Sequence, residues 1–155
     1  MPIRKSVKEA GLVGDQKMIE LLEIGQQVLA SQPFSVWIKA ELISFSEGKA
    51  ELVVPIADHL KQQYGYLHGG VLSYAADNAM TFAGGSVLGP SVITVEYKIN
   101  YLHPATGERL VARAYVIHAG KHQAVCRCDL FAVQGSEEIL CATSQGTISK
   151  YSRDE

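Results

Sequence analysis

The sequence lacks several features that mark particular classes of protein. Its 155 residues carry a formal net charge of only −2, with charges of both signs scattered along the chain. It therefore has neither the basic stripe of a nucleic-acid-binding protein nor a polybasic patch for an anionic membrane. No segment approaches the roughly 20 uninterrupted apolar residues of a membrane-spanning helix. Charges interrupt the first residues and no apolar run follows them, so we expect no secretory leader and a cytoplasmic protein.

Cysteine is also scarce, and its placement argues against a metal site. The three cysteines, Cys126, Cys128 and Cys141, lie in sequence that is typical of strands. Cys126 and Cys128 would share one face of a strand, a spacing too straight for the usual metal-binding knuckle. We therefore expect small buried thiols in a reducing compartment, with no metal and no cofactor. Because 47% of the residues are apolar, a full core is possible without disulfides.

The features that are present fit one domain over residues 1–155, since globular domains commonly have about 100–150 residues. Apolar residues at helical spacing predict an N-terminal helix over about 15–31, capped by Asp15. From Phe34 the apolar period changes to two, which predicts a core that starts at about residue 34 and ends at about 150. Its first elements are expected to be a strand hairpin over 34–42 and 50–56, and its last are long strands over 92–101, 110–118, 123–133 and 138–150.

Between the hairpin and the long strands lies a segment of small and apolar residues, 67–85. Glycine pairs open and close it, which suits a helix with a tight start and a left-handed end. Its residues are apolar or small on nearly every side, which predicts a helix that is buried on all faces. One such helix followed by long neighbouring strands predicts an α+β fold, with a strongly curved antiparallel sheet around the helix.

Asp77 is the single charged residue between Gly69 and Val95. A lone carboxylate in a buried helix costs several kcal/mol unless it is paired or its pKa shifts, and Asp is a poor helix former. Two interpretations of Asp77 therefore stand about equal. It is either a functional acid, or a structural carboxylate that bonds a backbone group or pairs with Lys or Arg across an interface.

The start of this helix reads His68-Gly69-Gly70. Amides at a helix N-terminus point outward, and glycine would let the carbonyl oxygen of another molecule approach them as in an oxyanion hole. A tight turn that merely needs glycine is the simpler alternative, and a lone His68 more often caps a helix than catalyses. Together with Asp77, the donors favour hydrolysis of an activated carbonyl. Because the two groups lie too far apart on one helix, we expect a symmetric dimer in which each subunit supplies half a site.

Four motifs carry a resemblance to a known family: Gln62-x-x-Gly65-x-Leu67-His68-Gly69-Gly70 followed by Asp77-Asn78, the strand from Thr94 to Pro104, the turn Gly120-Lys121, and Ala142-x-x-x-Gly146-Thr147. Over about residues 34–150 the chain resembles the PaaI-type hotdog thioesterases, within the 4-hydroxybenzoyl-CoA thioesterase-like superfamily. The resemblance implies a hotdog fold, a long central helix wrapped by a curved antiparallel sheet. It also implies homodimers that usually pair into tetramers, and hydrolysis of acyl-CoA thioesters without metal or cofactor.

The resemblance further implies a role for each residue of the site. The Gly69 amide would polarise the thioester carbonyl, Gln62 would donate to or orient the same oxygen, and His68 would help to position the thioester. Asp77, from the partner subunit, would act as general base or as nucleophile. Thr94 matches a small hydroxyl that holds the attacking water in relatives. Strand alternation, however, puts Thr94 on the face opposite Ile93, Val95, Tyr97 and Ile99.

Other residues match positions that contact the substrate in the family. The turn Gly120-Lys121-His122 would contact the phosphates of coenzyme A, Gly70 would lie beside the thioester, and Tyr66 would line the acyl or pantetheine channel. Ordinary surface charge and plain packing are the alternatives for these residues. A non-hydrolytic acyl-CoA-binding module, a hydratase or dehydratase of hydroxyacyl thioesters, and a purely structural Asp77 are rival interpretations. The acyl group stays open.

Overall fold

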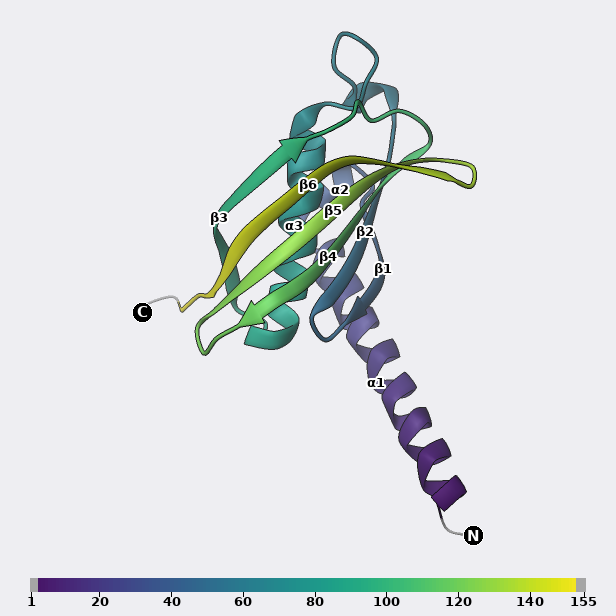
Figure 1. Cartoon of the computed structure of the whole chain (residues 1–155), viewed down its shortest axis with the longest axis vertical. Coiled ribbons are helices and arrows are strands. Elements are labelled where there is room, and N and C mark those ends of the chain that lie inside the picture. Colours follow the sequence, from purple (N-terminus) through teal and green to yellow (C-terminus); the bar gives the residue numbers. More distant parts are fainter. Residues whose placement is uncertain (1–2, 153–155) are drawn as a thin grey trace.

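A computed structural model describes residues 3–152, with side chains from residue 13 onward. One six-stranded antiparallel sheet, in the order β1-β2-β4-β5-β6-β3, curves around the long helix α3 (Figure 1). The strands are β1 (Glu41–Ser46), β2 (Lys49–Pro55), β3 (Val92–Tyr101), β4 (Arg109–Ala119), β5 (Gln123–Gln134) and β6 (Glu137–Lys150). The helices are α1 (Ile3–Ala30), α2 (Pro33–Trp37), the short 3-10 turn η1 (Asp58–Leu60) and α3 (Gly69–Leu88).

The central helix α3 contacts all six strands, which confirms the predicted α+β hotdog arrangement. Small residues on its sheet-facing side let the strands approach closely, and the alanines 75, 76, 79 and 83 are fully buried. At Gly84 a Cβ atom would lie 2.8 Å from the side chain of Ile148, so a larger residue there would push β6 away. Within residues 3–152, no helix combines the length and the apolarity that crossing a membrane requires.

The prediction that α3 is buried on all faces is wrong for the single chain. The side of α3 that faces away from the sheet is half-exposed, and it carries Ser73, Tyr74, Asp77, Asn78 and Thr81. The small residues that made the segment look uniformly apolar lie on the other side of the helix. We call these five residues the polar face of α3.

The N-terminal region differs from its prediction in two places. Helix α1 begins at Ile3 and passes through Asp15, so Asp15 does not cap it. The strand expected from Phe34 is wrong as well, because Pro33 occupies the first turn of the short helix α2 and the first strand begins only at Glu41. Proline suits that position because its fixed φ angle matches the first helical turn.

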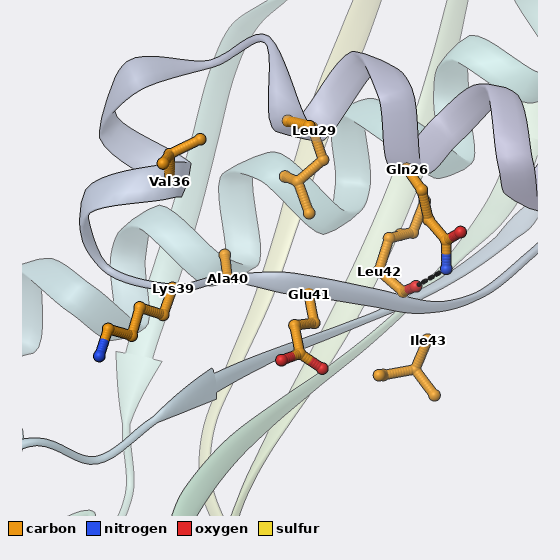
Figure 2. A pocket seen from close by; sticks show the side chains of 9 residues that line it. Gln26, Leu29, Val36, Lys39, Ala40, Glu41, Leu42 and Ile43 are labelled. Atoms are coloured by element: carbon orange, nitrogen blue, oxygen red, sulfur yellow. Dashed lines mark hydrogen bonds between the residues drawn. The ribbon is translucent and has the colours of Figure 1, made fainter.

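The free edge of β1 is covered by α1. The side-chain amide of Gln26 donates to the carbonyl of Leu42 over 3.0 Å (Figure 2). The pairing of β1 with β2 also shifts register between Leu42 and Ser44. Lys39, which precedes this strand, has a left-handed backbone with φ of 58°. Side-chain cover and an irregular register both make an edge a poor template for another strand.

The opposite edge strand, β3, contains a bulge that decides which way its side chains point. Its pairing with β6 shifts register between Thr94 and Glu96. Val95 and Glu96 are therefore both exposed, whereas Thr94 and Tyr97 are both half-buried on the side of α3. An extra residue reverses the alternation beyond it. The prediction that Ile93 and Val95 share the face of Tyr97 is thus wrong, and Thr94 faces the central helix.

Candidate active site

The start of α3 is held by the imidazole of His68. Its Nδ1 atom accepts a hydrogen bond of 2.9 Å from the amide of Gly70, which makes His68 the N-cap of the helix. A Cβ atom at position 70 would lie 2.9 Å from the same nitrogen, so the cap requires glycine there. The amide of Gly69 has no hydrogen-bond partner among residues 3–152. One amide at the positive end of α3 is therefore free to bind an oxygen atom.

A hollow of about 350 Å³ lies beside the start of α3, and Gln62, Tyr66, Gly69 and Tyr101 all line it. The Tyr101 hydroxyl donates to the carbonyl of Gly69 over 3.0 Å and fixes one wall. Gln62 lies in a turn closed by the bond from its own amide to the carbonyl of Tyr66, at 2.8 Å. We call this hollow the entrance cavity. It brings together three of the residues that the sequence analysis selected.

The side chain of Gln62 is oriented by its own loop. Its Oε1 atom accepts a hydrogen bond from the backbone amide of Tyr64. Its Nε2 group has no partner within the described part of the chain. Because an amide nitrogen carries two hydrogens, Gln62 can donate to an oxygen that is bound in the entrance cavity.

The carboxylate of Asp77 lies on the polar face of α3 and is bonded to the bulged strand. The Thr94 hydroxyl donates to Oδ1 of Asp77 over 2.6 Å. A second hydroxyl, that of Thr81, donates to the backbone carbonyl of Asp77 at 2.8 Å and lies 3.0 Å from the Thr94 oxygen. No cation of residues 13–152 pairs with Asp77. The carboxylate is thus oriented but not neutralised, and its second oxygen can accept a proton.

A neighbouring network on the same helix face escaped the sequence analysis. The side chain of Asn78 donates to Gln32 at 2.9 Å and to the Tyr74 hydroxyl at 3.0 Å, and the buried Ser35 bonds both Gln32 and Tyr74. Burial raises the pKa of the Tyr74 hydroxyl. The spacing of Tyr74 and Asn78, four apart on one helix, was the available signal. Nothing in the sequence indicated their partners, Gln32 and Ser35, which lie far from them along the chain.

The predicted coenzyme A contact lies far from the entrance cavity within one chain. Lys121 and His122 are exposed in the turn between β4 and β5, where the amide of Lys150 donates to the His122 carbonyl at 2.8 Å. This turn lies near the C-terminal end of α3, and the entrance cavity lies at its N-terminal end (Figure 1). A helix of 20 residues is about 30 Å long. A single chain therefore does not bring the two together.

Asp77 and Gly69 are also separated, because they lie eight residues apart on α3. That spacing corresponds to about 12 Å along the helix axis. A thioester carbonyl bonded to the Gly69 amide would be out of reach of Asp77 of the same chain. The hollow between α1, α2 and β1 in Figure 2 contains none of the predicted site residues.

The cysteines add no chemistry to this region. All three thiols are buried and free, and burial raises the pKa of Cys126 and of Cys141 to about 11. They stay protonated at neutral pH and are poor nucleophiles. In the part of the chain described by the structure, no group of three His, Cys, Asp or Glu side chains is placed to hold a metal ion.

Comparison with known proteins gives concordant matches. Residues 64–139 match the family described as the Thioesterase superfamily. A 1,4-dihydroxy-2-naphthoyl-CoA hydrolase of Listeria monocytogenes is 30% identical over 106 residues, which cover 67% of this chain and 85% of the relative. The solved structure of a thioesterase family protein from Silicibacter pomeroyi has a TM-score of 0.77 and 34% identity, with 81% of this chain and 93% of that chain covered. The PaaI protein of E. coli, at 19% identity, shares the fold with a TM-score of 0.76 over 87% of this chain and 96% of its own.

Proposed function

The chain belongs to the hotdog-fold thioesterase superfamily, and we propose that it hydrolyses acyl-CoA or aroyl-CoA thioesters to the free acid and coenzyme A. The general activity, thioester hydrolysis, follows from membership of the family. The proposal that the substrate is a coenzyme A thioester and that Asp77 acts on it rests on one observation. Thr94 orients the half-buried carboxylate of Asp77, and no cation among residues 13–152 neutralises it. A module that only binds thioesters has no use for such a group.

The proposed chemistry uses both ends of the site. The Gly69 amide and the Nε2 group of Gln62 donate to the thioester carbonyl oxygen and stabilise the negative charge that develops on it. Asp77 either removes a proton from the attacking water or attacks the carbonyl carbon itself to form a mixed anhydride that water then hydrolyses. In both routes the C–S bond breaks, and the thiolate of coenzyme A leaves and takes up a proton. His68 contributes by capping α3 and thereby positions the Gly69 amide.

The proposed active unit is a symmetric dimer. The separation of about 12 Å between Gly69 and Asp77 supports this, because a partner chain that runs the opposite way would set its own Asp77 opposite the entrance cavity. The polar face of α3 is half-exposed in one chain and is available for such contact. The edge strand β3 also exposes Ile93 and Val95, at 47% and 53%. Two dimers would then pair into a tetramer.

The same arrangement accounts for the predicted substrate contacts. In an antiparallel pair of chains, the turn Gly120-Lys121-His122 of one chain would approach the entrance cavity of the other, where its cation could meet the phosphates of coenzyme A. Tyr66, which is 40% exposed at the cavity, would contact the pantetheine arm, and the exposed Gly70 would lie beside the thioester. The three free thiols fit the reducing conditions of the cytoplasm.

The test is an assay of the purified protein on a panel of acyl- and aroyl-CoA thioesters, with a thiol-trapping reagent and a no-substrate control for the protein's own cysteines. We expect release of coenzyme A by the wild type and a loss of roughly a hundredfold or more in kcat for Asp77→Asn and Asp77→Ala. Circular dichroism and size-exclusion chromatography establish that both variants fold and keep the assembly of the wild type. Binding of thioesters without turnover would favour the alternative, a non-hydrolytic acyl-CoA-binding module.

A further inference from the structure

A second cavity, distinct from the entrance cavity, lies between the second half of α1, the second half of α3 and the start of β3. Its volume is about 330 Å³, at the small end of the range for ligand pockets. Apolar side chains from four elements form most of its wall: Leu21, Ile24 and Val28 of α1, Phe45 of β1, Phe82 of α3 and Val92 of β3. Among the residues whose side chains the structure describes, none that lines it is charged. We call it the α1–α3 cavity.

The α1–α3 cavity lies next to the pair of Asp77 and Thr94. On α3, Thr81 lines the cavity and lies one helical turn beyond Asp77, about 6 Å along the axis. On β3, Val92 lines the cavity and lies two residues before Thr94, on the same face of the strand. The hydroxyls of Thr81 and Thr94 are 3.0 Å apart and join the two walls. A carbonyl carbon held at Asp77 would therefore have its acyl substituent directed into this cavity.

Two polar side chains of the cavity wall bond other groups of the protein. The hydroxyl of Ser86 donates to the carbonyl of Ala83 at 2.6 Å and accepts from the amide of Gly48 at 2.7 Å. The side-chain amide of Asn78 donates to Gln32. The space between them is thus bounded mainly by hydrocarbon. An acyl group that carried a carboxylate would lose its hydration there and gain no cation in return.

We propose that the α1–α3 cavity receives the acyl group of the substrate, and that Ile24 and Val28 of α1 limit its size. The inference rests on the proposed function and names the substrate class: compact, uncharged and apolar acyl groups, such as hexanoyl or benzoyl. Acetyl groups leave the cavity empty, and succinyl groups bring a buried charge into it. The acyl specificity of this chain is therefore set by α1, which lies outside the central helix and its sheet.

Ile24 and Ile19 make a matched pair for the test. Both are on α1, and their side chains are 57% and 56% exposed, but only Ile24 lines the cavity. We expect the wild type to prefer hexanoyl-CoA and benzoyl-CoA over acetyl-CoA and succinyl-CoA by about tenfold or more in kcat/KM. Ile24→Trp fills the cavity and should lower the hexanoyl-to-acetyl ratio by about tenfold, whereas Ile19→Trp should leave the ratio unchanged. An unchanged ratio in Ile24→Trp, or equal use of succinyl-CoA and hexanoyl-CoA by the wild type, overturns the inference.

A binding measurement separates this inference from the proposed function. Titration calorimetry with hexanoyl and acetyl thioether analogues of coenzyme A reports the cavity without turnover. If the protein hydrolyses no thioester, the proposed function is refuted. The role of the cavity in acyl binding is still supported if the hexanoyl analogue binds more tightly than the acetyl analogue and Ile24→Trp abolishes the difference. If the protein hydrolyses thioesters but binds both analogues equally, the proposed function stands and the role of the cavity in acyl binding is refuted. Val28→Phe, a second filling variant on an exposed position, replaces Ile24→Trp if the latter has lost the helical signal of the wild type.

Discussion

Two aspartate–threonine pairs among the described residues have hydrogen bonds of the same length and different surroundings. In each pair the threonine hydroxyl donates to Oδ1 of the aspartate over 2.6 Å: Thr94 to Asp77, and Thr143 to Asp129. Asp129 lies on the outer side of the sheet, and Arg127 approaches the same oxygen at 3.5 Å. Asp77 lies on the polar face of α3 without a cation among the described residues.

The origins of the two pairs differ as well. Asp129 and Thr143 are direct partners across β5 and β6, so the sheet register alone brings them together. Asp77 and Thr94 join a helix to an edge strand, and they meet because of the bulge in β3. The first pair is an ordinary cross-strand contact that folding alone explains. The second needs a special backbone feature and holds a carboxylate that no cation among the described residues neutralises, so its charge is available for a reaction.

The largest effect should come from removing each carboxylate charge in turn. Asp77→Asn keeps the size of the side chain and should reduce kcat by roughly a hundredfold or more, because amides neither accept the proton of water nor attack a thioester. Asp129→Asn should leave kcat within about twofold of the wild type. The thiol-release assay measures both. Equal losses in the two variants would mean that Asp77 acts on folding and not on the reaction.

The next largest effect on kcat should come from removing the threonine hydroxyl of each pair. Thr94→Val removes the hydrogen bond to Asp77 at nearly constant volume and should lower kcat about tenfold, since the carboxylate is then no longer held in one orientation. Thr94→Ser, which keeps the hydroxyl, should recover most of the activity. Thr143→Val serves as the matched control and should not change kcat. If Thr94→Ser is as slow as Thr94→Val, the methyl group and not the hydroxyl is what matters.

The stability of the two threonine variants should be nearly the same. Thr94→Val and Thr143→Val each remove one hydrogen bond of equal length to a half-buried carboxylate, and each should lower the free energy of unfolding by about 1–2 kcal/mol. Urea unfolding at pH 7 measures the difference. The two pairs would then match in stability and differ in activity. A loss in Thr94→Val several times that in Thr143→Val would show that the first pair is mainly structural.

The smallest effect is expected for the cation that distinguishes the two pairs. Arg127 and Asp129 are 45% and 27% exposed and 3.5 Å apart, so solvent screens their attraction. Arg127→Ala should change the free energy of unfolding by less than about 0.5 kcal/mol and leave kcat unchanged. The same urea titration and assay check this. A loss above about 2 kcal/mol would mean that the outer pair depends on its cation far more than its exposure suggests.

The sequence predicted the elements that have a long, regular pattern. The central helix and the four long strands lie within a few residues of their predicted ranges, because their apolar residues recur over many turns or alternations. The short helix α2 was missed because five residues are too few to separate a helical from an alternating pattern, and Pro33 suits the start of a helix as well as its end.

From residue spacing alone, contacts within the candidate site were predictable only where its residues are close in sequence. His68, Gly69 and Gly70 form one turn, and the cap that joins His68 to Gly70 follows from that spacing. The contact between Asp77 and Thr94 was beyond reach, because alternation in β3 is interrupted by Val95, and a bulge leaves no mark in a run of β-branched residues. The bond of Asn78 to Gln32, the residue that precedes α2, depends likewise on tertiary packing.

The unequal edges of the sheet also bear on how many chains can join by strand addition. Gln26 and the irregular register block β1, whereas β3 presents unpaired backbone groups beside Ile93 and Val95. If two β3 strands pair in the proposed dimer, each chain uses its accessible edge, and the outer edges of the joined sheet are then two blocked β1 strands. Strand addition therefore stops at two chains. The side chain of one glutamine on α1 would in this way protect the protein against open-ended growth into fibres.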